Sequence, residues 1–199
     1  MGPDIETLIQ KISRLPGLGQ RSARRIVVHM IKNKNKENIF DPIMACMKKV
    51  SDNVKICPLC FNVDTFTGNS CSICSDDSRK KDLICIVETI TDLWAIERTF
   101  CFKGQYHVLD GLLSSLENRG PEVLRLEELN ERCEKQNVSE IVIALSATVE
   151  GQTTNHYIRN FFKDKHNIKI TSLAHGIPIG GELDYLDDAT LFTAFSARG

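Results

Sequence analysis

Apolar residues recur at helical spacing in two stretches near the start of the chain. The first stretch predicts an amphipathic helix over residues 4–14, with an apolar face made of Ile5, Leu8, Ile9 and Ile12. The second predicts a helix over residues 20–31 that buries Ala23, Ile26, Val27 and Met30. Between them, the segment Leu15-Pro16-Gly17-Leu18-Gly19 predicts a tight turn. Proline disfavours helix at the residue before it, and glycine permits backbone angles closed to other residues.

A third helix is predicted from Asp41-Pro42, which has the residue types of an N-cap and a first helical turn. Its apolar stripe is expected to be buried and consists of Ile43, Met44, Met47 and Val50. The methionines are expected to fill a core and not to bind a ligand.

Strand and helix patterns alternate farther along the chain. Leu83 to Val87 form a continuous apolar run, as in a strand buried on both faces, and Glu88 follows it. Further strands are predicted over 106–109, 140–144 and 169–173, and helices over 92–98, 126–135 and 152–164. Alternation of this kind indicates an α/β fold with a parallel sheet covered on both faces. Function in such sheets gathers beyond the carboxyl ends of the strands, which here carry Glu88 and residues 146–152.

Four cysteines form two C-x-x-C pairs, Cys57 with Cys60 and Cys71 with Cys74, separated by ten residues. This spacing can bring four thiolates to the corners of one tetrahedron, the geometry of structural zinc sites. The segment is too short to fold on apolar burial alone, so a bound metal would supply most of its stability. All four positions would be filled by protein, which leaves none for a substrate. Two disulfides and a redox dithiol pair are the alternative interpretations.

Composition narrows the class of protein. Hydrophobic residues at 42% and charged residues at 26% are ordinary for a soluble globular chain, and no apolar run approaches the roughly 20 residues that span a bilayer. The first ten residues lack the features of a secretory signal, so we expect a cytoplasmic, nucleoid-associated protein with no membrane partner. Thiols stay reduced there, which favours metal over disulfides. The other cysteines are expected to be core or near-core thiols: Cys46, Cys85, Cys101 and Cys133.

Charge is distributed unevenly although the net charge is only −1. Eight basic residues and no acidic residue lie from Lys11 to Lys36, a run that includes Lys34. At the other end, an acidic cluster comprises Glu182, Asp184, Asp187 and Asp188. The asymmetry favours a nucleic-acid-binding N-terminal part.

The hairpin turn predicts how that part would contact DNA. Gly17 and Gly19 before a helix N-terminus would present unpaired backbone N–H groups to a phosphate, flanked by Arg21 and Arg25 one helical turn apart. The other candidate DNA-binding residues are Lys11, Arg14 and Arg24. Contacts of this kind recognise charge and not base sequence, so single- and double-stranded DNA are both expected partners. An ordinary helical hairpin with a solvated basic face is the alternative.

These features, with Thr148-Val149-Glu150-Gly151 and the segment from His175 to Leu183, occur in an order that resembles the RecR family of bacterial recombination mediators over essentially the full chain. The resemblance implies a helix-hairpin-helix domain over 1–54, a four-cysteine zinc finger over 55–78, a Toprim domain over 79–174, and a C-terminal Walker-B-like segment and helix over 175–199. It also implies a non-catalytic clamp or adaptor that acts with RecO and RecF to load RecA on single-stranded DNA. Members of the family assemble as dimers or ring-shaped tetramers.

The same resemblance makes Glu88, Asp92 and Glu150 an acidic Toprim surface. Toprim enzymes need several carboxylates around Mg²⁺, and Gln152 stands here where an acidic residue is frequent, so we expect a partner-binding surface and no enzyme. The chain also has no G-x-x-x-x-G-K-[ST] phosphate loop for ATP hydrolysis. For the acidic C-terminal cluster, a helix start capped by Asp187 or Asp188 is the alternative to a Walker-B role. Two other functions remain open: a Mg²⁺-dependent Toprim nuclease or primase-like enzyme, and a zinc-ribbon RNA-binding protein.

Overall fold

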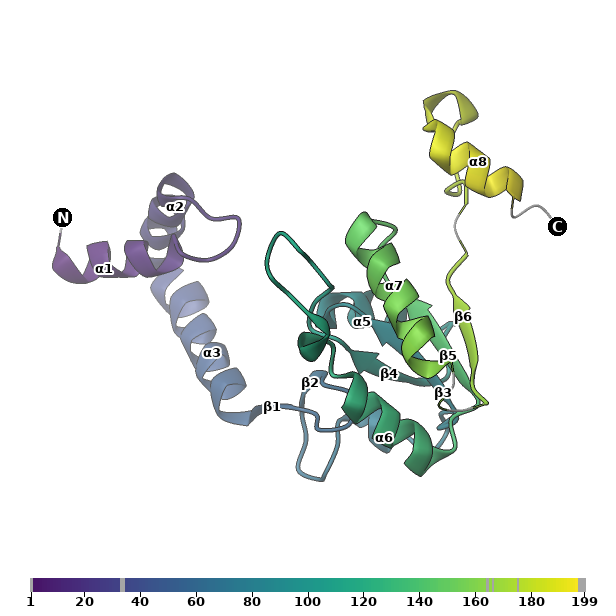
Figure 1. Cartoon of the computed structure of the whole chain (residues 1–199). Coiled ribbons are helices and arrows are strands. Elements are labelled where there is room, and N and C mark those ends of the chain that lie inside the picture. Colours follow the sequence, from purple (N-terminus) through teal and green to yellow (C-terminus); the bar gives the residue numbers. More distant parts are fainter. Residues whose placement is uncertain (1, 33–34, 164, 166, 175, 197–199) are drawn as a thin grey trace. The chain divides into compact units, whose positions relative to one another are not determined.

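The computed structural model describes residues 2–32, 35–163, 165, 167–174 and 176–196. It divides into two compact units, Met1–Val54 and Lys55–Gly199, each described by itself below (Figure 1). No helix in this described part of the chain is long and apolar enough to cross a membrane.

The first unit is a helical hairpin followed by a longer helix. Helices α1 (Pro3–Ile12) and α2 (Gln20–Ile31) pack against each other around the buried residues Ile9, Ala23 and Val27. Ile5, Leu8 and Ile12 pack around this group, and within each helix the apolar residues recur every three or four positions, so each helix presents one apolar face to the other. Both predicted helices are therefore confirmed, although the first ends at Ile12 and not at residue 14, and Ile26 and Met30 of the second are only partly buried. A π-helical turn, Lys36–Phe40, then leads directly into α3 (Asp41–Asn53).

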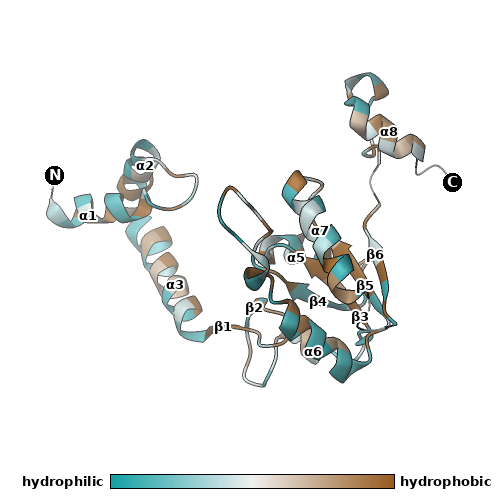
Figure 2. Cartoon of the chain, viewed as in Figure 1, coloured by the Kyte–Doolittle hydropathy of each residue, from teal (hydrophilic) through white to brown (hydrophobic). Residues whose placement is uncertain are grey.

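The predicted burial of α3 is wrong. None of its residues is buried, and the expected stripe lies open, with Ile43 39% exposed, Met44 52%, Met47 63% and Val50 58%. Hydrophobic residues can be followed along this helix in Figure 2. The physical reason is that no second layer covers the stripe within the described residues of this unit. Asp41 is also not an N-cap, because the π-helical turn already supplies the preceding helical backbone and the Asp41 side chain makes no capping bond.

The second unit is built on a four-stranded parallel sheet in the order β4-β3-β5-β6, which confirms the predicted α/β fold class. Its strands are β3 (Leu83–Val87), β4 (Gln105–Val108), β5 (Glu140–Ala144) and β6 (Lys169–Ser172). In the register, Ile86 lies opposite His107 on one side and Ile143 on the other. Because β4 stands first in the strand order and pairs only with β3 in this sheet, it is an edge strand.

Alternate residues of each strand enter two separate cores. Ile84 and Ile86 face the core formed with α6 (Leu126–Gln136) and α7 (Val149–Phe162), which lie over the same side of the sheet in Figure 1. Cys85 and Val87 face the other core, which includes Leu93 of α5 (Ile90–Glu97) and all four cysteines of the two C-x-x-C pairs. The period of two in side-chain direction produces both cores from one apolar run.

The four-cysteine segment, residues 54–75, comprises β1 (Val54–Ile56), β2 (Val63–Thr65) and the short helix α4 (Ser72–Ser75). It covers the edge of the sheet, since the backbone N–H of Val108 in β4 donates to the carbonyl of Cys60 (2.9 Å). An edge strand needs such cover because its free N–H and C=O groups would otherwise pair with another chain.

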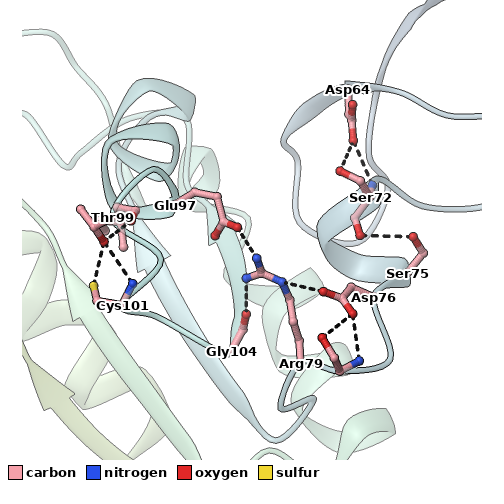
Figure 3. A network of polar contacts seen from close by, with 11 residues as sticks. Asp64, Ser72, Ser75, Asp76, Arg79, Glu97, Thr99, Cys101 and Gly104 are labelled. Atoms are coloured by element: carbon pink, nitrogen blue, oxygen red, sulfur yellow. Dashed lines mark hydrogen bonds and ion pairs between the residues drawn. The ribbon is translucent and has the colours of Figure 1, made fainter.

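Residues 75–81, which the polar composition predicts as a linker, are held by Arg79. Its guanidinium binds Glu97 of α5, the carbonyl of Gly104 (3.1 Å) and Asp76 (3.5 Å), as Figure 3 shows. These contacts hold the polar segment against α5 and against the residue that precedes β4.

The C-terminal part contains a 3-10 turn, Leu183–Tyr185, and α8 (Asp188–Ser196). The Asp187 carboxylate accepts hydrogen bonds from the backbone N–H (2.9 Å) and the hydroxyl (2.7 Å) of Thr190, which confirms a helix start at the acidic cluster. Phe192 and Phe195 are exposed. The predicted end of α7 at Asp164, and His175 of the family segment, lie outside the described residues.

Candidate metal centre and nucleic-acid interface

The four sulfurs of Cys57, Cys60, Cys71 and Cys74 lie within 4.8 Å of one another, and all four residues are buried. The Sγ atoms of Cys60 and Cys71 are 3.5 Å apart. A tetrahedral zinc with Zn–S bonds of about 2.3 Å places its sulfurs about 3.8 Å apart, so the cluster fits such an ion. All four thiols are free, which does not support the disulfide alternative. The structure thus brings together every predicted ligand in a group that could hold a metal ion.

Local backbone geometry explains why the pairs converge. The Phe61 N–H donates to the carbonyl of Cys57 (2.9 Å). Phe61 itself adopts a left-handed conformation (φ 62°), which turns the chain back so that the carbonyl of Asn62 accepts from the Cys57 N–H (2.8 Å). The Cys71 N–H donates to the Cys57 sulfur (3.4 Å), joining the two pairs. N–H groups directed at sulfur stabilise thiolate ligands.

Asp64 fastens the loop between the two pairs. Its carboxylate accepts from the N–H of Thr65 (2.7 Å). It also accepts from the N–H (2.9 Å) and hydroxyl (2.7 Å) of Ser72 at the start of α4, as Figure 3 shows. The bonds from Ser72 hold the pKa of the Asp64 carboxyl below its usual range, because they favour its charged form. The carboxylate therefore remains ionised and orients the second pair.

Two of the other cysteines differ from the prediction. Cys85 and Cys133 are buried as expected, but Cys46 and Cys101 are exposed. Cys46 lies on the open helix α3, and Cys101 lies in the loop after α5, so neither is covered by a core.

The predicted DNA-binding residues lie between the end of α1 and the second turn of α2. Gly17 has a φ of +77°, which only glycine adopts without strain, and Gly19 is the N-cap of α2. The first turn of α2 has no acidic residue and its N-cap makes no side-chain hydrogen bond. The basic side chains of this segment are all exposed; they are Lys11, Arg14, Arg21, Arg24 and Arg25. Lys34 of the same basic run lies outside the described residues.

This arrangement is suited to a phosphate group. The N-terminus of α2 supplies N–H groups and the positive end of the helix dipole. Arg21 and Arg25 are separated by one turn of α2 and project from the same side of it.

Two of the three predicted acidic residues share a cavity at the carboxyl end of the sheet. Glu88 follows β3 and Glu150 lies in the first turn of α7, and both line a cavity of about 310 Å³. Burial and the neighbouring Asp92 raise the pKa of the Glu88 carboxyl, because both disfavour its charged form. Asp92 does not line the cavity: its carboxylate accepts from the Thr89 N–H (2.9 Å) in the capping box of α5. Gln152 does not line it either.

Sequence reasoning missed Arg119 and Glu117, which line the same cavity and form an ion pair. They belong to the loop after β4, where no spacing pattern indicates which side chains turn inward. It also missed Arg132, a buried residue of α6 beside the cysteine cluster.

Comparison with known proteins covers nearly the whole chain. Family models match residues 5–39 as "RecR, helix-hairpin-helix", 82–174 as "Toprim domain" and 176–198 as "RecR, C-terminal". The chain is 47% identical to the recombination protein RecR of Methylocella silvestris, 49% to that of Bartonella bacilliformis and 48% to that of Sinorhizobium fredii. In each case the match covers 99% of this chain and 96% of the relative.

Proposed function

This chain belongs to the RecR family, and from that premise we propose that it is a recombination mediator that binds DNA without base specificity and catalyses no reaction. The proposed role includes DNA repair, in the cytoplasm at the nucleoid. Its proposed boundaries are a helix-hairpin-helix domain over 1–54, a metal-binding segment over 55–78, a Toprim domain over 79–174 and a C-terminal segment over 175–199.

The observation that carries the proposal is the turn around Gly17 and Gly19. It combines a glycine at positive φ, an uncapped helix start and exposed arginines with no acidic residue in the first turn of α2. Such a site attracts any phosphodiester, because N–H groups and guanidinium groups contact the oxygens that all sequences share.

DNA binding over a range of salt concentrations tests this proposal. Arg21→Ala and Arg25→Ala should each weaken binding to any sequence and lower the salt slope by about 0.9 for a duplex or about 0.7 for a single strand. Lys81→Ala is the matched control, since Lys81 is an exposed cation of the second unit that pairs with Asp77. Unchanged affinity and slope in both arginine variants would refute the hairpin as the DNA site.

For the cysteine cluster we propose a structural zinc ion bound by Cys57, Cys60, Cys71 and Cys74. Four buried sulfurs at the spacing of a tetrahedral site support it, and the bound ion would hold the segment 54–75 in its folded form. Metal analysis of the reduced, purified protein is the test: about one zinc per chain is expected, and an absence of bound metal would overturn it.

For partner proteins we propose RecO and RecF, with RecA loading on single-stranded DNA as the outcome. The cavity containing Glu88 and Glu150 supports a contact for a cationic partner surface. Glu150→Gln should weaken binding of RecO in calorimetry without changing the unfolding temperature. Unchanged RecO and RecF binding in Glu88→Gln and Glu150→Gln variants would exclude this surface.

For assembly we propose a dimer or a ring-shaped tetramer. The apolar side chains of α3 and α8 that lie exposed in the single chain support it, because apolar faces of this kind are normally covered. Light scattering with and without DNA measures the mass directly, and a monomer at all concentrations would contradict the proposal.

A second candidate function is a Mg²⁺-dependent Toprim enzyme, favoured by the shared cavity of Glu88 and Glu150. Strand cleavage or primer synthesis that requires Mg²⁺ and disappears in Glu88→Gln would establish this function. The same result would refute the non-catalytic proposal.

A further inference from the structure

A guanidinium group is buried beside the cysteine cluster. Arg132 of α6 is 5% exposed, although arginine is almost never fully buried without a charged partner. No Asp or Glu forms an ion pair with Arg132 within the residues that the structure describes. Its cationic charge is therefore buried with neutral partners only, an arrangement that is normally unfavourable.

The hydrogen bonds of Arg132 lead to both C-x-x-C pairs and to the edge strand. Its Nη1 donates to the carbonyl of Leu59 (3.0 Å), within the first pair, and to that of Tyr106 (2.7 Å) in β4. Its Nη2 lies 2.5 Å from the side-chain oxygen of Gln105 and 4.0 Å from the sulfur of Cys74, in the second pair. Its Nε donates to Gln136 (3.0 Å). One buried cation thus contacts both halves of the cluster.

A divalent ion bound by four thiolates carries a net charge of −2. That charge would be buried too, because Cys57, Cys60 and Cys71 are 0% exposed and Cys74 is 7% exposed. The carboxylate of Asp64, which accepts from the N–H of Ser72 next to Cys71, adds to the negative charge. Opposite charges at short distance inside a protein offset each other's desolvation cost.

We infer that Arg132 is the internal counter-charge of the metal centre: it strengthens metal binding and holds the loaded segment against β4. The inference rests on the proposed zinc site. Arg132 binds no metal itself and acts as a positioning residue, through its charge on the thiolates and through its bonds to Leu59 and Tyr106.

The alternative is that Arg132 is only a brace whose hydrogen bonds matter and whose charge does not. Gln105 separates the two roles because its side-chain oxygen already accepts from Arg132. Gln105→Glu keeps that hydrogen bond and strengthens it, but it cancels the guanidinium charge. If Arg132 acts as a counter-charge, metal binding should be weaker in Gln105→Glu. If Arg132 acts only as a brace, the added charge should not weaken metal binding.

The experiment measures Zn²⁺ and Co²⁺ affinity of the full-length chain by competition with a chelator. Arg132→Met should lower metal affinity by about 10- to 100-fold, the usual effect of losing a group that supports metal ligands. Arg132→Lys, which keeps the charge, should bind metal more tightly than Arg132→Met. Lys135→Met is the matched control, since it removes an exposed charge from the same helix.

Gln105 variants provide a second series if Arg132→Met does not fold. Gln105→Glu loses the bond from the Gln105 amide to the Cys74 carbonyl (3.2 Å) as well as adding charge. Gln105→Leu is the control: it loses the same bond, and also the acceptor for Arg132, without adding charge. Metal affinity should be lower in Gln105→Glu than in Gln105→Leu.

The outcomes separate the two proposals. If the wild-type chain binds neither metal, the zinc site itself is refuted. If the wild type binds metal but Arg132→Met binds it equally well, the role of Arg132 is refuted while the zinc site stands. Equal losses in Arg132→Lys and Arg132→Met would also refute it, and so would an affinity in Gln105→Glu that equals or exceeds that of Gln105→Leu, because the charge would then have no effect of its own. The spectrum of the Co²⁺ form should remain that of a four-sulfur site in every variant that binds.

Discussion

The buried imidazole of His107 predicts a specific pH dependence of stability. His107 lies on β4, is 0% exposed and contacts the ring of Phe61 edge-on at a centroid distance of 5.3 Å. Neither ring nitrogen makes a hydrogen bond of normal geometry with the described residues. Burial, reinforced by the cationic Arg132 and Arg125, lowers the pKa of His107 to about 3. The folded chain therefore keeps this imidazole neutral. The substitution His107→Leu tests the consequence, because leucine has no group that binds a proton.

The magnitude follows from proton linkage. Between about pH 3 and pH 6.5 the unfolded chain binds a proton on His107 that the folded chain does not. The contribution of His107 to stability is thus fully present above about pH 6.5 and falls by about 1.4 kcal/mol per pH unit below it, so acidification from pH 6.5 to pH 5.0 lowers this contribution by about 2 kcal/mol. His107→Leu cannot bind that proton. It should remove this part of the pH dependence and leave the rest.

Urea unfolding at pH 7.5 and pH 5.0, followed by circular dichroism, measures the difference. At pH 7.5 the variant should be at least as stable as the wild type, because leucine has no polar atoms to bury unpaired. At pH 5.0 it should be the more stable of the two by about 2 kcal/mol. His156→Gln, which removes an exposed histidine from α7, is the control and should follow the wild type. Identical pH dependence in the wild type and His107→Leu would refute the reasoning.

Three further predictions concern the metal-binding segment, the hairpin and α3. Asp64→Ala removes the acceptor of three hydrogen bonds and should destabilise the chain by about 1–3 kcal/mol in thermal unfolding, whereas the exposed Asp77→Ala should not. Gly17→Ala forces a side chain into positive φ at a cost of about 1–2 kcal/mol, and DNA affinity should fall; Gly68→Ala, where φ is not positive, should leave it unchanged. Met47→Glu charges the open stripe of α3 and should reduce the mass measured by light scattering, so an unchanged mass would exclude this face from assembly.

Local patterns were sufficient for much of this protein. The strand predicted over 140–144 is β5 with the same bounds, because its apolar run is short and ends at turn residues. The two C-x-x-C pairs predicted the sulfur cluster, since two residues between ligands and a ten-residue loop keep the four thiols close along the chain. Gly17 was identified for the same reason: a tight turn between two helices requires positive φ within a few residues.

Spacing patterns did not predict features that depend on contacts with parts of the protein far away in the sequence. The stripe of α3 has helical period, but the period shows only that one face is apolar, not that anything covers it. The second role of Asp92, whose carboxylate caps α5, was likewise not indicated by any spacing pattern.

By itself, the sequence determined the longer helices, the strands of the parallel sheet, the four-cysteine group and the basic turn, because each of these depends on residues that are neighbours along the chain. Only the tertiary structure decided the environment of Arg132, which in sequence is one charged residue among many in an amphipathic helix. Its partner Leu59 is 73 positions away, and the packing of α6 beside β4 and the cysteine segment makes that charge a buried one. Burial and charge pairing arise from such long-range contacts, which local periodicity does not encode.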